Sequence, residues 1–215
     1  MHDNFPVPLE CGRRVRSDGS VASWTIDPLR EVELQAIDAT VFVREGGFRR
    51  WLGSPDAPIV CVRGNHDFVD LASLFEGCGP VHELIDDEVI EVLGLRVTGH
   101  RGIPRISGVW SDEVERDELR RKVDGLPVAD LYLTHYPPAG VLDDEIQRGR
   151  EVSFGLEGML EALEARIPER SIHCFGHIHG RGGTMKERGA GSWIGGVGAR
   201  RTFSNAACGW NEIEV

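Results

Sequence analysis

The sequence predicts an α/β fold in which sheets and helices pack in layers around a shared core. Short apolar runs rich in β-branched residues alternate along the chain with longer charged segments of helical character, and one hairpin interrupts the alternation. The 215 residues contain no internal repeat and no low-complexity linker, and this length suits one compact domain. We expect that domain to span residues 15–215. Residues 1–14, which show no periodicity, should form a poorly ordered N-terminal segment.

In the first half of the chain, local signals mark each expected element. Asp27 and Pro28 combine a capping carboxylate with a proline in the first helical turn. Leu93 and Gly94 separate two runs of alternating character, which predicts a hairpin. The expected elements are a helix at 27–35, strands at 39–43 and 59–62, a short helix at 70–76, and the hairpin strands at 89–92 and 95–98.

The second half continues the alternation. Ser111 should cap a charged helix that Gly125 ends. The abundance of glycine between residues 176 and 198 predicts a loop there instead of a regular element. The expected elements are helices at 111–123 and 156–165 and strands at 129–134, 171–175, 201–203 and 213–215.

Composition excludes several classes of protein. A formal net charge of -11 argues against non-specific binding to nucleic acid, which needs a basic surface to displace counterions. No apolar stretch approaches the roughly 20 residues that span a bilayer, and the N-terminal residues do not resemble a signal peptide. The five cysteines are odd in number and form no Cys-x-x-Cys pair, a usage typical of a reducing compartment. We therefore expect a cytoplasmic protein without a membrane partner.

Three histidine-bearing stretches follow apolar, strand-like runs. They are Gly64-Asn65-His66-Asp67, Thr134-His135 and Gly176-His177-Ile178-His179. Because α/β folds gather their sites at strand ends, we expect these side chains to meet at one rim of a sheet. Imidazoles together with oxygen donors suit zinc, iron or manganese. Each stretch alone has a simpler explanation, such as turn chemistry or a loop histidine, but their combination favours a metal site.

The individual residues suggest roles within such a site. Asn65 offers an amide oxygen, and the two imidazoles of Gly-His-x-His can reach one metal or two. A metal held there would polarise a phosphoryl group and lower the pKa of bound water. His66 need not be a ligand, because it could instead donate a proton to a leaving oxygen while Asp67 orients its ring. His100, beside Arg101, is the further histidine that we expect to face a substrate.

In their order and spacing these stretches resemble the calcineurin-like metallophosphoesterases. The run Thr134–Asp143 and the ending Phe203–Ala207 add to this likeness, which is greatest to the small metallophosphoesterase-domain proteins grouped with class III cyclic-nucleotide phosphodiesterases. The resemblance covers roughly residues 15–215 and is specific from Ile59 onward. It implies a four-layer α/β/β/α sandwich, two mixed sheets flanked by helices, with a two-metal centre.

The sequence departs from that family where the family places half of its ligands. The expected Asp-x-His becomes Asp18-Gly19-Ser20, with serine in place of the histidine. The expected Gly-Asp-x-x-Asp becomes Arg44-Glu45-Gly46-Gly47-Phe48, which puts Glu45 at the metal-bridging position and Phe48 at the second carboxylate. Arg44 replaces a glycine and could bind phosphate there, although a solvated loop residue is an equal alternative.

The resemblance then implies two metal sites of unequal quality. The intact site would use Glu45, Asn65, His135 and His177, and the weakened site would use Asp18, Glu45 and His179. The cofactor would be one or two divalent ions of manganese, iron, zinc or nickel. The implied substrate-binding residues are Arg44, Asn65, His100 and Arg101.

Three hypotheses about function follow. We favour a metal-dependent phosphoesterase that acts on a phosphodiester or phosphomonoester, with a small phosphate ester or a nucleotide as its partner. The alternative is a catalytically impaired relative that serves as a binding or scaffold subunit for a protein partner. A purely structural metal site is disfavoured, because its ligands come from strand ends that lie far apart in the sequence.

Overall fold

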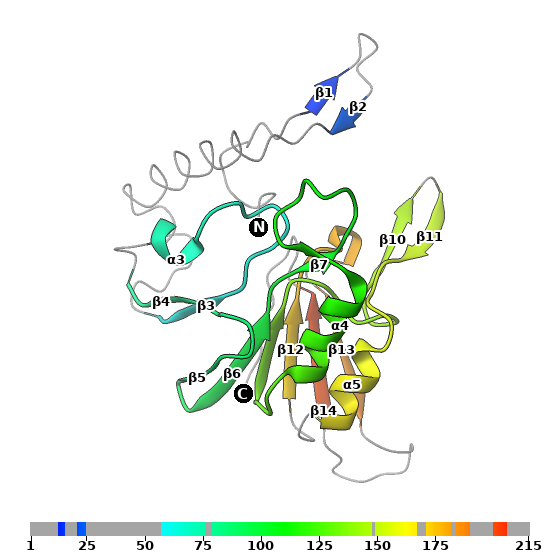
Figure 1. Cartoon of the computed structure of the whole chain (residues 1–215). Helices are drawn as coiled ribbons and strands as arrows, with labels where there is room; N and C mark the ends of the chain where they lie inside the picture. Colours follow the sequence, from blue (N-terminus) through cyan, green and yellow to red (C-terminus); the bar gives the residue numbers. More distant parts are fainter. Residues whose placement is uncertain are drawn as a thin grey trace.

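The computed structural model describes residues 13–15, 21–24, 57–75, 79–147, 149–166, 171–181, 184–189 and 200–205. The expected helix at 27–35 and the expected strands at 39–43 and 213–215 lie outside these described residues. The described chain is an α/β structure with several parallel and mixed sheets and few helices (Figure 1). The predicted fold class is confirmed at that level.

A six-stranded mixed sheet forms the centre of the described structure. Its strand order is β13-β14-β12-β9-β6-β5, with β14, β12, β9 and β6 parallel and the two edge strands antiparallel to their neighbours. The strands span Val89–Val92 (β5), Leu95–His100 (β6), Leu131–Thr134 (β9), Ser171–Phe175 (β12), Thr184–Gly189 (β13) and Arg200–Asn205 (β14). Because β6, β9 and β12 run in one direction, their carboxyl ends meet at one edge of the sheet.

The hairpin between β5 and β6 is confirmed. Leu93 and Gly94 have φ angles of 52° and 81°, and two successive positive φ angles are what a tight two-residue hairpin turn requires. The short helix α3 is also confirmed, because Leu71–Leu74 are helical and the Asp70 side chain accepts the Ser73 N–H as a cap.

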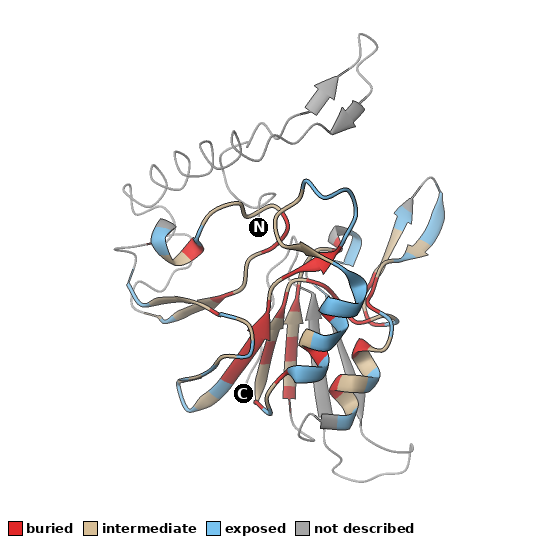
Figure 2. Ribbon diagram, in the orientation of Figure 1, coloured by how far each residue is buried: buried red, intermediate tan, exposed pale blue. Residues whose placement is uncertain are grey.

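Helices α4, Arg116–Gly125, and α5, Met159–Arg166, lie side by side against one face of the sheet (Figure 1). Figure 2 shows that their sheet-facing residues are buried while their outer faces are exposed. No helix among the described residues is long and apolar enough to cross a membrane. The main core cluster comprises Ile103, Leu119, Val123, Leu126, Ala129, Tyr132, Tyr136, Leu156, Met159 and Leu163.

The described residues also form four two-stranded sheets. The pairs β3–β4 and β7–β8 are parallel, and the pairs β1–β2 and β10–β11 are antiparallel. Their strands span Arg13–Val15 (β1), Val21–Trp24 (β2), Ile59–Cys61 (β3), Val81–Glu83 (β4), Ile103–Pro104 (β7), Glu113–Val114 (β8), Asp144–Gln147 (β10) and Arg150–Ser153 (β11).

The helix expected directly after Ser111 begins later than predicted. α4 has Glu115 at its N-cap, and the preceding residues form β8 instead. Asp112 has a φ of 54°, a left-handed conformation that a right-handed helix does not continue. Gly125 ends the helix as its last residue.

The second expected helix also begins late. α5 starts at Met159 and not at Leu156, because Leu156 forms an isolated β-bridge with Pro138 and Gly158 has a φ of 76°. A turn with Gly158 in a left-handed conformation therefore separates the β-bridge at Leu156 from the start of α5.

Regular structure occurs in two regions for which we predicted no helix or strand. Residues 184–189 are β13, which pairs with β14, so the glycine-rich segment 176–198 is not a loop throughout. A 3-10 turn, η2, spans His179–Arg181. The hairpin β10–β11 was also missed, because its strands are charged and lack an alternating apolar pattern.

At the N-terminus, Arg13 and Arg14 belong to β1, although we assigned them to the irregular segment 1–14. β1 pairs with β2 in a sheet of its own, so the strand that precedes Asp18 is not part of the six-stranded sheet. Residues 1–12 lie outside the part of the chain that the structure describes.

Candidate metal centre

The three histidine-bearing stretches come from three strand ends, as the sequence predicts. β9 ends directly before His135, and β12 ends two residues before His177. The parallel pairing of β9 with β12 brings these ends together, and the Gly176 N–H donates to the His135 carbonyl at 3.1 Å. Asn65 follows β3, which belongs to a different sheet. The site therefore joins two sheets, and the expectation that all three stretches meet at one rim of a single sheet is wrong for Asn65.

The side chains of Asn65, His135 and His177 converge on one point. Asn65 Oδ1 lies 2.8 Å from His135 Nε2 and 3.2 Å from His177 Nδ1. The two ring nitrogens lie 3.2 Å from each other. Asn65 is buried, and the two histidines are partly exposed. Three groups that can each present a lone pair thus form a small triangle.

This triangle fits a divalent cation. Two ligand atoms at about 2.1 Å from a metal and at a right angle to each other lie about 3.0 Å apart, and a tetrahedral angle gives about 3.4 Å. The three separations of 2.8, 3.2 and 3.2 Å fall around the first of these values. The donor set of two imidazoles and one amide oxygen suits manganese, iron or zinc. Among the described residues no three His, Cys, Asp or Glu side chains are grouped so that they could hold a metal ion, so a site here would also need the amide oxygen of Asn65.

His177 has an unusual backbone conformation. Its φ of 68° lies in the left-handed region, which a non-glycine residue adopts only where its surroundings hold it. The ring packs against Tyr136, with centroids 4.9 Å apart, and edge-on against His135, with centroids 5.1 Å apart. Burial raises the pKa of Tyr136, so this neighbour stays a neutral wall of the site.

The turn at residues 64–67 places Asn65. The Gly64 N–H donates to Asp67 Oδ2 at 2.7 Å, and the Asp67 N–H donates to the Gly64 carbonyl at 3.0 Å. Asp67 therefore closes the turn, a contact that we did not predict. Its expected role of orienting His66 stays a prediction.

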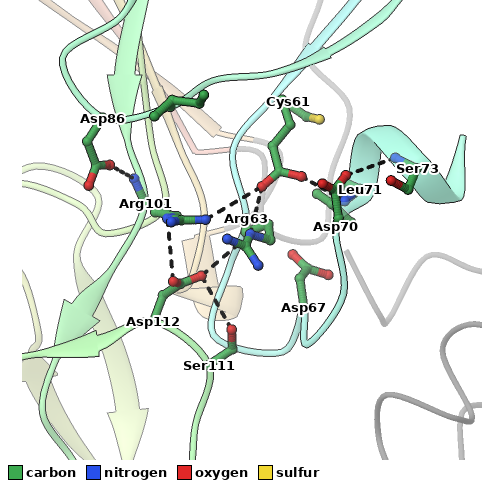
Figure 3. Close-up of polar contacts among 12 residues, drawn as sticks. Cys61, Arg63, Asp67, Asp70, Leu71, Ser73, Asp86, Arg101, Ser111 and Asp112 are labelled. Atoms are coloured by element: carbon green, nitrogen blue, oxygen red, sulfur yellow. Dashed lines mark hydrogen bonds and ion pairs between the residues drawn. The ribbon is translucent and has the colours of Figure 1, made fainter.

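A network of ion pairs holds the residues next to the turn at 64–67 (Figure 3). Arg63, the residue before the turn, contacts Glu83 at 2.6 Å and Asp112 at 3.8 Å. Arg101 contacts the same two carboxylates, at 3.9 Å and 3.5 Å. Glu83 also accepts the Leu71 N–H at the start of α3, at 2.7 Å. The network thus ties β3, β4, α3 and the segment before α4 into one frame.

Both residues expected beside a substrate after β6 are already engaged. Arg101 holds Glu83 and Asp112 as described. His100 has an exposed fraction of 1%, and its Nδ1 lies 3.3 Å from the Arg101 carbonyl. A substrate would reach this imidazole only through a change in the surrounding structure, so the substrate-facing position that we expected for His100 is not the one observed.

A second buried histidine lies beside the first. His173 on β12 contacts Thr134 Oγ1 through Nε2 at 2.8 Å, and Thr134 is the partner of His100 in the β6–β9 register. Burial lowers the pKa of His100 to about 4 and that of His173 to about 3. Both imidazoles are neutral at pH 7, in agreement with a structural role for His173.

Several predicted site residues cannot be placed. Asp18, Arg44 and Glu45 lie outside the described residues. His179 lies in η2, but its side chain also lies outside the described structure. These four stay predictions.

Sequence reasoning missed one neighbour of the site. The ring of Trp110 packs edge-on against His66, with centroids 4.5 Å apart and an interplanar angle of 61°. In the sequence, Trp110 directly precedes Ser111, the expected helix cap, and belongs to no motif. It reaches the site because it lies on the loop between the short strands β7 and β8.

A family match agrees with this geometry. Residues 36–181 match a protein-family model described as calcineurin-like phosphoesterase, and this range covers well over half of the chain. The chain belongs to the calcineurin-like phosphoesterases. A comparison with curated proteins found no match. The match is shorter than the resemblance over 15–215 that we expected, and it leaves out Asp18.

Membership of this family suggests metal-dependent hydrolysis of phosphoesters, with divalent cations as cofactors and phosphate esters as substrates. The matched range contains all three residues of the triangle, Asn65, His135 and His177. The glycine that precedes Asn65 also falls within it.

Gly64 leaves the space that the His135 ring occupies. A Cβ added at Gly64 would lie 2.6 Å from His135 Cε1, closer than real contacts allow. We expect Gly64→Ala to push the ring out of the triangle and to weaken binding of manganese or zinc about tenfold or more, as measured by calorimetric titration. Gly125→Ala is the matched control, because its Cβ would lie 3.5 Å from Asp87 Oδ1 and should leave the affinity unchanged. Equal affinities for the wild type and Gly64→Ala would contradict this account of the site.

Proposed function

We propose that this protein is a metal-dependent phosphoesterase that hydrolyses a phosphodiester or a phosphomonoester. The observation that carries the proposal is the triangle of Asn65, His135 and His177, whose donor atoms lie 2.8 to 3.2 Å apart at the meeting of two sheets. The family membership supports the same reaction class. We further propose that the complete fold is the four-layer α/β/β/α sandwich expected from the resemblance.

Asn65, His135 and His177 would hold the first cation, with Glu45 as a fourth ligand. A second and weaker cation would use Asp18, the same Glu45 and His179. A bound cation of this kind polarises the phosphoryl group and lowers the pKa of adjacent water. One or two ions of manganese, iron, zinc or nickel satisfy this proposal.

The protein's own side chains would handle the leaving group and the phosphate. His66 follows Asn65 on the same turn, so its imidazole would donate a proton to the oxygen of the departing group. Asp67 keeps that turn closed through the Gly64 N–H. Arg44 would contribute a fixed cation beside the phosphate, and Arg101 would do so only by exchanging its present carboxylate partners.

A second candidate is an impaired relative that binds a nucleotide or a protein partner without turnover. Three departures in the sequence favour it, namely Ser20, Glu45 and Phe48. Ser20 stands where the family resemblance implies an imidazole ligand, so one cation would bind more weakly. Glu45 is one methylene longer than the expected aspartate, and Phe48 removes a carboxylate that the resemblance implies would hold His66.

Metal analysis combined with turnover separates the candidates. The purified chain would be stripped with a chelator, reloaded with manganese or zinc, and assayed on bis(4-nitrophenyl) phosphate and on 4-nitrophenyl phosphate. We expect at least one tightly bound ion per chain and metal-dependent release of nitrophenol. A chain that binds no metal and shows no turnover supports the impaired relative, and tightly bound metal without turnover supports a structural site. Cyclic nucleotides, nucleotide diesters, phosphoproteins and small phosphomonoesters would then be compared as substrates.

A further inference from the structure

We infer that Trp110 is a positioning residue that fixes the ring of His66 in the orientation needed for proton donation. The inference rests on the proposed function, in which His66 serves the leaving group. It concerns a residue on a separate loop, 44 positions away in the sequence.

The loop that carries Trp110 is internally fixed. It connects β7 to β8, and its base is closed because the Ile103 N–H donates to the Asp112 carbonyl at 3.1 Å. The Glu113 carboxylate accepts the backbone N–H groups of Ile106 and Ser107 at 3.1 and 3.0 Å, and that of Gly108 as well. Three successive N–H groups bound by one carboxylate leave the loop little freedom.

The same loop is attached to the turn that contains His66. The Ser111 N–H donates to the Asn65 carbonyl at 3.1 Å. Trp110 directly precedes Ser111, and His66 directly follows Asn65, so this hydrogen bond joins the backbones next to both rings. The ion pair between Arg63 and Asp112 adds a second connection on the other side (Figure 3).

Packing against the hydrophobic core also restrains Trp110. It is partly buried and packs against the main hydrophobic core, so its ring is not a mobile surface group. An edge-on contact with a centroid separation of 4.5 Å is a favoured aromatic geometry, which limits rotation of the His66 ring about its side-chain torsions. His66 itself is partly exposed, so burial alone does not fix its ring.

Orientation matters because proton transfer depends on short, aligned contacts. A misplacement of about 1 Å can lower a rate about 10²-fold. The loss should depend on the leaving group, since a nitrophenolate leaves readily without a proton whereas a phenolate, with a pKa near 10, does not.

The first test compares bis(4-nitrophenyl) phosphate with diphenyl phosphate, using the manganese-loaded full chain. We expect Trp110→Ala to lower kcat for diphenyl phosphate about 10²-fold and to change kcat for the nitrophenyl ester by less than about threefold. Trp110→Phe, which keeps an aromatic ring, should recover most of the rate. Adding Trp110→Ala to His66→Ala should cause no further loss. Equal losses on both esters, or additive losses in the double variant, would overturn the inference.

The second test does not depend on turnover. In zinc-loaded protein with labelled histidine, the ring proton resonance of His66, assigned by its disappearance in His66→Gln, should shift in Trp110→Ala and shift less in Trp110→Phe. The resonance of His173 in the core should not move, which shows that the fold is intact. An unchanged His66 resonance rejects the positioning role. If neither ester is hydrolysed by the wild type, the proposed function fails, and this measurement still decides whether Trp110 orients His66.

Discussion

Replacing His135 by alanine is expected to remove both metal binding and turnover. His135 contributes one corner of the triangle, and its Nε2 lies within 3.2 Å of both other donor atoms. Loss of one of the three proposed ligands should lower the affinity for manganese or zinc at least 100-fold, with turnover falling below detection at micromolar metal. Calorimetric titration and the nitrophenyl ester assay measure the two quantities on the same preparation.

His66→Ala is the matched comparison, because it removes an imidazole two residues from Gly64 without touching the triangle. We expect metal affinity within about twofold of the wild type and a loss in kcat on diphenyl phosphate of 10²- to 10⁴-fold, the usual range for a general acid. If His66→Ala also releases the metal, His66 is a ligand and its role as a proton donor is wrong. If His135→Ala retains full affinity, the triangle is not the metal site.

Mild acid is expected to destabilise the protein strongly through its two buried histidines. The pKa values of about 4 for His100 and about 3 for His173 lie well below the ordinary value near 6.5. Burial is the main cause for both. For His100, Asp86 and Asp87 raise the pKa and Lys122 lowers it.

The sign follows from proton binding in the two states. Below pH 6.5 the unfolded chain binds protons at both histidines while the folded chain does not, so the free energy of unfolding falls as the pH falls. The loss continues until the folded pKa values are reached. At pH 5 each histidine lowers the free energy of unfolding by about 2 kcal/mol relative to pH 7, and the pair by about 4 kcal/mol.

Urea unfolding at pH 7 and pH 5 measures this effect, in the presence of a chelator so that metal release does not contribute. His173→Gln keeps a polar partner for Thr134 Oγ1 and cannot titrate, so the difference in free energy between the two pH values should shrink by about half. The double variant with His100→Gln should lose most of the difference. A wild type whose free energy of unfolding is the same at both pH values would falsify the assignment of two neutral buried imidazoles.

Sequence signals within an element were enough to predict those elements whose turn, cap or apolar run is local. The hairpin around Leu93-Gly94, helix α3 with Asp70 as its cap, and strand β12 at 171–175 all lie where the pattern predicts. The elements that were missed or misplaced depend on partners elsewhere in the chain. β13 becomes a strand by pairing with β14, and β8 forms by pairing with β7 where a helix was expected.

The chemistry proposed for the candidate metal centre follows from the sequence alone, because Asn65, His135 and His177 are recognisable by residue type and by their positions after strand-like runs. The tertiary structure decided which groups meet. The parallel register of β9 and β12 sets the distance between the two imidazoles, and burial separates His100 from solvent although we expected it to face a substrate. Trp110 reaches His66 only because backbone hydrogen bonds fold one loop onto another. Such contacts depend on the three-dimensional path of the chain, which residue spacing does not encode.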